Sequence, residues 1–205
     1  GSEMCIRDSA GVIVSGPDCH FGYKAAGDCA MLERLSSEYG YRYFVVDKER
    51  DEEGKIISST YIREMLADGN IIKANKLLGY YYFVTGTVQH GNAIGHTKLY
   101  PTANLIPPAV KHLPKFGVYV TRVTVDGKTY GGLTNVGAKP TISGENPVGV
   151  ETYLYNFEGD LYGKDMKVEL LDFVRPEMKF ESIDALKAQL DHDIKECQRR
   201  YLEFA

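Results

Sequence analysis

The sequence predicts an α+β protein in which a short α/β segment precedes a β-rich domain that ends in a helix. Before Gly79, short apolar runs alternate with helical patterns, which is typical of a parallel-sheet fragment. After Gly79, runs rich in Val, Tyr and Thr are separated by turn residues, which favours a barrel or a sandwich. A single apolar stripe then marks a long helix near the C-terminal end.

Composition limits the class of protein. The 205 residues are 43% hydrophobic, enough for one full domain and a smaller piece. The net charge of −4 gives no electrostatic support for a nucleic-acid partner or an anionic membrane. We expect a cytoplasmic protein, because the sequence contains neither a spanning apolar run nor a signal peptide. Its four cysteines form no C-x-x-C pair, so reduced thiols are expected, although a Cys19–Cys29 disulfide stays open.

The segment before Gly79 contains two apolar runs and two helical patterns. Residues 1–9 have no periodicity and are expected to be a tag or an artefact. The pair Asp68-Gly69 should interrupt the second helical pattern. The expected elements are a buried strand at 12–14, a helix at 30–39, a strand at 43–46 and a broken helix at 59–78.

The segment after Gly79 contains the β-rich runs and the last helix. Asp126-Gly127 predicts a type I′ hairpin turn, because both central residues need a positive φ. Ser182 is a candidate N-cap for the last helix. The expected strands lie at 82–88, 117–125, 128–134, 148–155 and 166–174, and the apolar stripe of the helix is Ile183, Leu186, Leu190, Ile194, Cys197 and Tyr201.

Three features of this second segment suggest chemistry. A loop with Gly91 and Gly95 follows the first strand, and glycines let backbone N–H groups approach a polyphosphate, although a plain hairpin loop has the same pattern. Pro101 stiffens the next segment, where Thr102 and Asn104 share one side of an extended chain. They can offer two neutral oxygens to Mg²⁺, or they can bond backbone groups in a turn.

The third feature is Glu151, which interrupts the β-rich run Val150-Glu151-Thr152-Tyr153-Leu154. Strands are depleted in Glu, so this position is unusual. A carboxylate that faces a pocket can accept a hydroxyl proton during phosphoryl transfer. One that faces solvent contributes only surface charge.

The ordered set of motifs from Tyr81 onward resembles the riboflavin kinase family. The resemblance implies a six-stranded antiparallel Greek-key barrel with a C-terminal helix, which transfers the γ-phosphate of ATP to the 5′-hydroxyl of riboflavin with Mg²⁺. The motifs are G-x-V-x-H-G, P-T-A-N at 101–104, N-V-G-A-K-P-T at 135–141, V-E-T-Y-L at 150–154, D-L-Y-G at 160–163, R-P-E at 175–177 with Phe180, and Gln189 with Asp193-Ile194.

The resemblance also assigns roles to individual residues. Glu151 would be the general base, and Thr102 and Asn104 would meet Mg²⁺. This chain departs from the usual family pattern at three places. It has Lys98-Leu99-Tyr100 where the family usually has Leu-Gly-Phe before P-T-A-N, and His96 where the family usually has Arg. It has Tyr153 where the family usually has His, two residues after the Glu. ATP would be bound by Gly86, His90, Gly91, Gly95, Lys98, Pro101 and Thr102, and the flavin by Arg175, Phe180 and Asp193.

The N-terminal segment resembles the second half of the FMN adenylyltransferase module of bifunctional bacterial flavin-synthesis enzymes. The landmarks are P-D-C-H-F-G-Y-K at 17–24 and I-S-S-T-Y-I-R at 57–63. In that family Ser59, Thr60 and Arg63 would form a nucleotide site at a helix start. The H-x-G-H motif of that module does not occur in this sequence, so we expect no FAD synthesis. Half a sheet leaves an open edge, so this segment is expected to be poorly stable or to self-associate.

These observations give one leading hypothesis and two alternatives. We expect riboflavin kinase activity from a barrel domain at 80–205, preceded by a partial adenylyltransferase-like fragment at 10–79. The alternatives are a flavin- or nucleotide-binding barrel without turnover and a remnant FMN adenylyltransferase. The expected ligands are riboflavin or FMN and ATP or ADP, with Mg²⁺ as cofactor and neither nucleic acid nor membrane as a partner.

Overall fold

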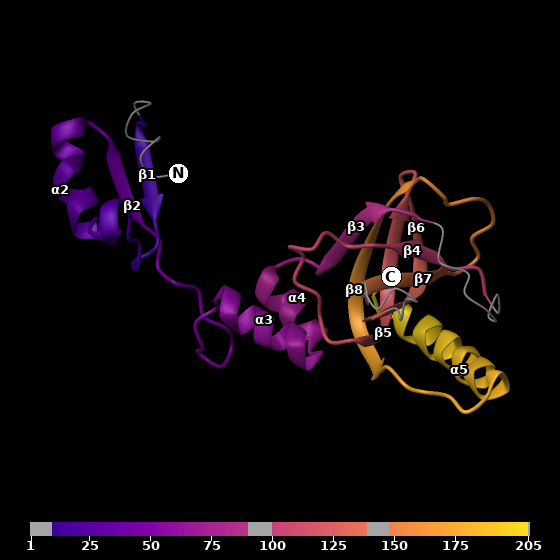
Figure 1. Cartoon of the computed structure of the whole chain (residues 1–205). Helices are drawn as coiled ribbons and strands as arrows, with labels where there is room; N and C mark the ends of the chain where they lie inside the picture. Colours follow the sequence, from indigo (N-terminus) through magenta and orange to yellow (C-terminus); the bar gives the residue numbers. More distant parts are fainter. Residues whose placement is uncertain (1–9, 90–99, 139–147, 205) are drawn as a thin grey trace. The chain divides into compact units, whose positions relative to one another are not determined.

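The computed structural model describes residues 10–89, 100–138 and 148–204, which Figure 1 draws in colour. The chain divides into two compact units, Gly1–Ile57 and Ser58–Ala205. In the described part of the chain, no helix is both long and apolar enough to cross a membrane.

The first unit is a parallel strand pair with one α-helix. Strand β1 (Val12–Ser15) pairs in parallel with β2 (Arg42–Val45), as predicted, and α2 (Cys29–Tyr39) connects them after a short 3₁₀ turn, η1 (Tyr23–Ala25). The expectation that the first strand is buried is wrong, because Val14 is 58% exposed. Helix α2 packs against β2, while Val12 and Val14 of β1 stay exposed.

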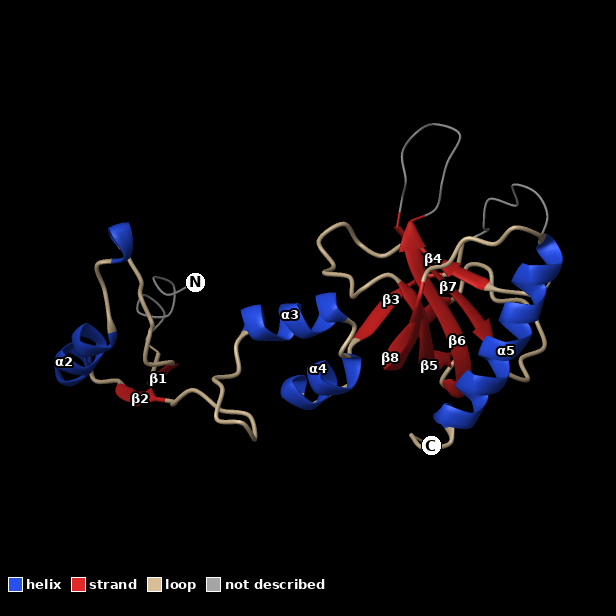
Figure 2. Cartoon of the chain, turned by 90° about the horizontal axis from the view of Figure 1, so that it is seen from below, coloured by secondary structure: helices blue, strands red, loops and turns tan. Residues whose placement is uncertain are grey.

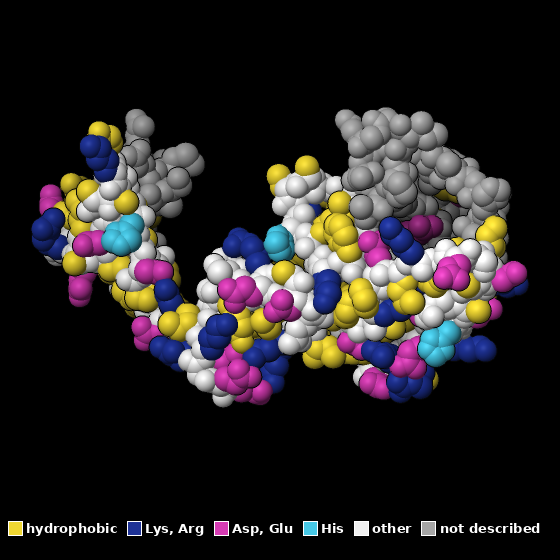
Figure 3. Space-filling view, turned by 60° about the horizontal axis from the view of Figure 1, so that its bottom comes forward, with side chains coloured by type: hydrophobic (Ala, Val, Ile, Leu, Met, Phe, Trp, Pro, Cys, Tyr) yellow, Lys and Arg dark blue, Asp and Glu magenta, His cyan; other side chains and the backbone are white. Residues whose placement is uncertain are grey.

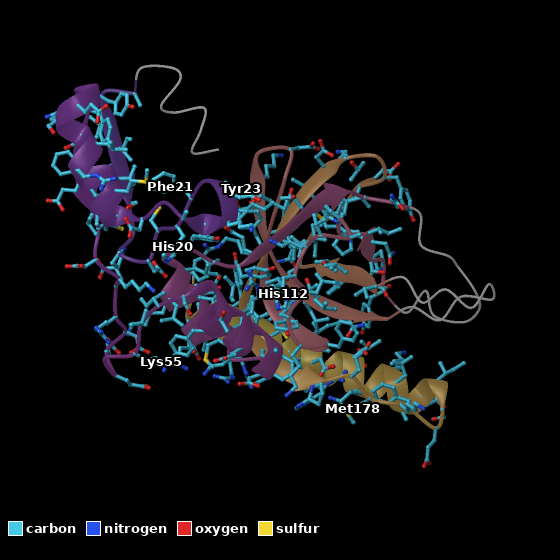
Figure 4. The ribbon with its side chains drawn as sticks, turned by 60° about the vertical axis from the view of Figure 1, so that its left-hand side comes forward. His20, Phe21, Tyr23, Lys55, His112 and Met178 are labelled. Carbon is cyan, nitrogen blue, oxygen red and sulfur yellow. The ribbon has the colours of Figure 1, made fainter. Side chains whose placement is uncertain are left out.

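The loop after β1 carries the first landmarks of the adenylyltransferase resemblance. His20, Phe21 and Tyr23 lie on it, as Figure 4 shows. Phe21 pairs with Gly27 through two backbone hydrogen bonds, of 2.9 and 3.0 Å, so the loop closes on itself. Gly27 is suited to this position, because a Cβ there would lie 2.6 Å from the Phe21 ring.

Two short helices open the second unit. Helix α3 (Ser59–Asp68) ends at Gly69, whose φ of 81° is left-handed, and α4 (Ile71–Leu78) follows at once. The predicted break at this glycine is therefore confirmed. Ser58, one residue earlier than the predicted phosphate-binding Ser59, caps α3 by accepting a hydrogen bond from the Tyr61 N–H.

The remainder of the second unit is a nearly closed six-stranded antiparallel barrel. The strand order is β3-β8-β5-β6-β7-β4, in which β8 returns beside the β5–β6–β7 meander, so the arrangement is a Greek key. The main-chain N–H of Gln89, just after β3, donates a 2.9 Å hydrogen bond to Asn104 of β4 and draws the two edges together. The strands are β3 (Phe83–Thr87), β4 (Ala103–Leu105), β5 (Gly117–Val125), β6 (Lys128–Ala138), β7 (Val148–Leu154) and β8 (Asp165–Pro176).

Two positions in the barrel need glycine. Asp126 and Gly127 have φ values of 50° and 71°, which confirms the predicted type I′ turn between β5 and β6. Gly117 opens β5 with φ of 150°, and a Cβ there would lie 2.2 Å from the carbonyl oxygen of Arg175. Gly117 therefore permits β8 to approach β5 closely where Arg175 is placed.

Three fully buried threonines lie among the apolar side chains inside the barrel. The Thr134 hydroxyl bonds those of Thr121 and Thr152, both at 2.9 Å. Each hydroxyl thus has a partner, which removes the cost of burying it. The apolar side chains around them include Val84, Leu105, Tyr119, Val123, Val136, Val150, Val168 and Leu170.

Helix α5 (Ile183–Tyr201) covers the outer face of the barrel. It packs against β5, β6 and β8, as Figure 2 lets the reader follow. The Ser182 hydroxyl accepts a 3.1 Å hydrogen bond from the Ala185 N–H, so the predicted N-cap is confirmed. Gly131 of β6 admits the helix, because a Cβ there would lie 2.9 Å from the Tyr201 ring. The buried contacts are Val118, Val120, Leu133, Tyr155, Leu171 and Cys197.

Helix α4 belongs to the same core as the barrel. The buried Asn75 side chain donates a 2.8 Å hydrogen bond to the Leu170 carbonyl and accepts a 2.7 Å bond from the Tyr82 N–H. The Tyr82 hydroxyl donates a hydrogen bond to the carbonyl of His112, a residue that Figure 4 labels. The boundary between the two compact units lies after Ile57, whereas the sequence pattern changes near Gly79. Apolar helix residues buried in the barrel core, such as Ile71 and Ala74, explain the difference.

Candidate active site

A row of polar side chains crosses three strands on the outer face of the barrel. Asn104 of β4 lies directly opposite Glu151 of β7, and Glu151 lies directly opposite Asn135 of β6. Directly paired residues on antiparallel strands point to the same face. The three side chains therefore form one continuous polar row, with the carboxylate in the middle.

Thr102 adds a hydroxyl to this row. It follows Pro101 and immediately precedes β4, and its Oγ1 donates a 2.6 Å hydrogen bond to Oε1 of Glu151. Asn104 is 9% exposed, and Glu151 is half-buried. The structure thus brings together Thr102, Asn104 and Glu151, three residues to which the sequence assigned metal and proton chemistry. All three present oxygen atoms.

The same row continues toward Arg175. Asn135 pairs with Val118 of β5, and Val118 pairs with Arg175 of β8. Three strand spacings separate Glu151 from Arg175 in this order, or about 14 Å along the sheet at ~4.8 Å per spacing. Glu151 and Arg175 therefore lie on the same outer face of the sheet, and α5 packs on this face against β5, β6 and β8.

Arg175 is held by a buried carboxylate from α5. Its Nε and Nη2 donate to Oδ2 of Asp193 at 3.0 and 2.6 Å, a two-pronged geometry that favours strong binding. Asp193 is 1% exposed, and Gln189 Nε2 donates a 2.8 Å hydrogen bond to its other oxygen. The Arg175 guanidinium lies 6.0 Å from the ring centre of Phe180. Three residues that the sequence assigned to the flavin thus form one cluster.

Sequence reasoning missed a second contact between α5 and the site. The hydroxyl of Tyr100 donates a hydrogen bond to the carboxylate of Asp191, and its ring centre lies 5.2 Å from that of Tyr153. This hydrogen bond, followed by burial, raises the pKa of Tyr100. The residues that meet here lie far apart in the sequence, and no spacing pattern marks them. The departures from the family pattern at Tyr100 and Tyr153 were the available signal.

The remaining candidates are distributed along the chain. Gly86 lies within β3 opposite Met166, and Pro101 is exposed. Ser59, Thr60 and Arg63 lie exposed on the first turns of α3, and their predicted nucleotide role stays a prediction. Four of the predicted ATP-binding residues lie outside the described residues, namely His90, Gly91, Gly95 and Lys98.

The donor atoms of the site fit Mg²⁺ better than a softer metal. Mg²⁺ takes oxygen ligands, keeps several waters and uses few protein groups together with substrate phosphates. Thr102, Asn104 and Glu151 supply a hydroxyl, an amide and a carboxylate. Within the described ranges, no group of three or more His, Cys, Asp or Glu residues could hold a metal by itself. Such a site would need the phosphates of a nucleotide to complete its coordination.

Acidic and basic side chains are interspersed on the face of the barrel unit that Figure 3 shows. Ion pairs join Arg199 and Arg200 of α5 to Glu196, and another joins Arg200 to Asp172 of β8. A nucleic-acid surface would instead gather positive charge in a stripe. The charge pattern on this face gives no support for a nucleic-acid surface.

Comparison with known proteins connects this geometry to a family. The family model described as "Flavokinase: Riboflavin kinase" matches residues 78–201, which include the polar row, the Arg175 cluster and α5. The chain belongs to the riboflavin kinase family. Its riboflavin kinase domain is the six-stranded barrel with its C-terminal helix.

Two bacterial relatives share most of the chain. A "Bifunctional riboflavin kinase/FMN adenylyltransferase" of Listeria monocytogenes is 35% identical over 181 residues, covering 88% of this chain and 57% of the relative. The protein of the same name from Haemophilus influenzae is 38% identical over 186 residues, covering 88% of this chain and 58% of the relative. The chain therefore spans less than three fifths of the length of these relatives.

A solved structure shares the fold of the riboflavin kinase domain and of the residues before it. A crystal structure described as that of a macrolide-efflux protein from Streptococcus pneumoniae superimposes with a TM-score of 0.78 and 37% identity. The match covers 91% of this chain and 60% of that one. The predicted six-stranded antiparallel barrel with a C-terminal helix is confirmed.

Proposed function

We propose that this chain is a Mg²⁺-dependent riboflavin kinase that transfers the γ-phosphate of ATP to the 5′-hydroxyl of riboflavin, giving FMN. The observation that supports this most directly is the 2.6 Å hydrogen bond from Thr102 to Glu151, with Asn104 directly opposite the same carboxylate. A phosphoryl-transfer site needs a carboxylate for the hydroxyl proton beside neutral oxygens for the metal–phosphate group. Membership of the riboflavin kinase family supports riboflavin as the phosphate acceptor and ATP as the donor.

Each residue has a separate task in this proposal. Glu151 accepts the proton of the attacking 5′-hydroxyl through the carboxylate that Thr102 orients. Thr102 and Asn104 would hold Mg²⁺, which when bound neutralises the charge of the ATP phosphates. The Arg175 cluster would meet the flavin ring system.

The direct test is product formation. The purified chain is incubated with riboflavin, ATP and MgCl₂, and riboflavin, FMN and FAD are separated by chromatography. We expect FMN, no FMN in excess EDTA, and its return when MgCl₂ is restored. Failure to form FMN with enzyme equimolar to riboflavin would refute the kinase proposal.

The same assay separates the alternatives. Retention of riboflavin without any ATP-dependent product would indicate a binding barrel without turnover. Formation of FAD from FMN and ATP would indicate adenylyltransferase activity. The names of the relatives motivate this second measurement, because they include FMN adenylyltransferase.

A further inference from the structure

Three side chains join the Thr102 segment to the C-terminal helix. Tyr100 donates its hydroxyl proton to the Asp191 carboxylate on α5, and its ring lies against Tyr153, with 5.2 Å between ring centres and 57° between planes. Tyr153 lies two residues after Glu151 on β7 and shares its outer face. We call Tyr100, Tyr153 and Asp191 the tyrosine clamp.

The tyrosine clamp joins the two segments that carry the ends of the proposed site. Tyr100 is two residues before Thr102, whose hydroxyl bonds Glu151. Asp191 is two residues before Asp193, whose carboxylate binds Arg175. A displacement of α5 would therefore act on both the Arg175 cluster and the segment that holds Thr102.

The hydroxyl of Tyr100 is the specific element of the clamp. A hydroxyl that donates to an ionised carboxylate makes a stronger hydrogen bond than a neutral pair does. Both Tyr100 and Asp191 are half-buried, so water competes less for this bond than at an exposed position. A phenylalanine at this position could stack on Tyr153 but could not reach Asp191 with a hydrogen bond.

We propose that Tyr100 is a positioning residue that couples the two substrate sites through Asp191. The clamp fixes the Thr102 segment relative to α5, so that nucleotide binding at one end and riboflavin binding at the other favour the same arrangement. This inference rests on the proposed function. Because binding coupling is reciprocal, each ligand should tighten the other by the same factor.

The test measures that factor by calorimetry. Riboflavin binding is titrated with and without saturating Mg-ADP, in the wild-type chain and in Tyr100→Phe, Asp191→Ala and the double variant. We expect Mg-ADP to tighten riboflavin binding about fivefold or more in the wild type, within the usual range of coupling. The factor should fall toward one in both single variants. The double variant should show no further loss, because both changes remove the same bond.

Matched variants separate positioning from general stability. Asp191→Asn keeps an oxygen that can accept from Tyr100, so it should retain more coupling than Asp191→Ala. Tyr80→Phe removes the hydroxyl of a tyrosine that is 54% exposed, and its coupling should equal that of the wild type. Urea unfolding of each variant shows whether stability has changed, and a structural role alone would move the unfolding midpoint without moving the coupling factor.

Failure of the inference can be told from failure of the proposed function. A wild-type chain that makes FMN, together with a Tyr100→Phe variant that keeps full coupling, would refute the role of Tyr100 alone. Additive losses in the double variant would also refute it. A wild-type chain that binds neither riboflavin nor Mg-ADP would refute the proposed function and the inference together.

Discussion

The hydroxyl of Thr102 and the carboxylate of Glu151 share a 2.6 Å hydrogen bond across the start of the β4–β7 pair. Because Thr102 is the donor, one oxygen of Glu151 is occupied and turned toward the P-T-A-N segment. The second oxygen makes no hydrogen bond with the described residues, and in the proposed mechanism it would accept the proton of a substrate hydroxyl. This arrangement leads to the first two predictions.

Replacement of Glu151 by Gln should remove most of the turnover. Gln has nearly the same shape but cannot accept the proton, and general-base catalysis typically contributes about 10²- to 10⁴-fold. The kcat for FMN formation should fall by this order while riboflavin binding persists. Glu169→Gln is the control, since Glu169 bonds Lys167 on β8. Full kcat in Glu151→Gln would show that another group accepts the proton.

Replacement of Thr102 by Val should weaken the use of Mg-ATP. Valine keeps the shape of threonine but removes both the oxygen for the metal and the donor to Glu151. We expect the KM for Mg-ATP to rise by about tenfold, the effect of roughly 1.4 kcal/mol of lost binding. Thr102→Ser keeps the hydroxyl and should stay close to the wild type. Equal kinetics in the Val and Ser variants would contradict a role for the hydroxyl.

Replacement of Asp193 by Ala should destabilise the barrel unit. It leaves Arg175 without its buried partner, and removing one member of a buried ion pair typically costs ~3–5 kcal/mol. Urea unfolding measures the change in free energy. Arg199→Ala is the control, because its exposed ion pair with Glu196 should contribute under about 1 kcal/mol.

A double variant tests what the pair does besides stabilise the fold. Arg175→Met combined with Asp193→Leu replaces the ion pair with apolar side chains, which is often tolerated without loss of stability. This variant should recover much of the unfolding free energy that Asp193→Ala loses. It should nevertheless bind riboflavin poorly. Normal riboflavin affinity in the double variant would remove the Arg175 cluster from the flavin site.

The cysteine thiols should differ in reactivity. A hydrogen bond from the Tyr43 hydroxyl lowers the pKa of Cys29, whereas burial raises the pKa of Cys197 to about 12. A lower pKa leaves more reactive thiolate at neutral pH. Iodoacetamide should therefore label Cys29 faster than Cys197, which it should label only after unfolding.

A variant of Tyr43 tests the cause of that reactivity. Tyr43→Phe removes the hydroxyl, so the midpoint of Cys29 labelling should move to higher pH. Tyr41→Phe is the matched control, since the Tyr41 hydroxyl donates to the Leu32 carbonyl instead. Peptide mass spectrometry follows each site. An unchanged midpoint in Tyr43→Phe would show that Tyr43 does not lower the pKa of Cys29.

Replacement of Asn75 by Leu should destabilise the barrel even though Asn75 precedes it in the sequence. Leucine leaves the Leu170 carbonyl and the Tyr82 N–H without partners, and a buried unsatisfied group costs ~1–3 kcal/mol. Urea unfolding followed by Tyr fluorescence measures the loss. Ile72→Ala, at a position that is 54% exposed, should have little effect. Equal stability of both variants would mean that α4 does not contribute to the barrel.

Local features of the chain were predictable because they depend on neighbours in the sequence. The Asp126-Gly127 turn, the Gly69 break and the Ser182 cap follow from backbone preferences alone. The same-side placement of Thr102 and Asn104 follows from the period of an extended chain.

Contacts between distant segments were not predictable from spacing. The sequence suggested that Arg175 and Asp193 lie near one ligand, but their ion pair depends on how α5 packs across β8. The Tyr100–Asp191 hydrogen bond depends on the same packing. The exposure of Val14 was missed because a short apolar run has the same pattern in a covered and an uncovered sheet.

The placement of α4 has a consequence for how such a domain can be exchanged between proteins. Asn75 satisfies a backbone carbonyl in β8 and a backbone N–H just before β3, at opposite ends of the barrel sequence. A gene fusion that joined a new partner near residue 78, where the family match begins, would remove Asn75. It would also remove Ile71 and Ala74 and so expose the part of the barrel core that they cover. A junction near Ile57 would transfer the barrel with both helices attached. The compact unit that contains the barrel therefore begins earlier in the chain than the match to the family model.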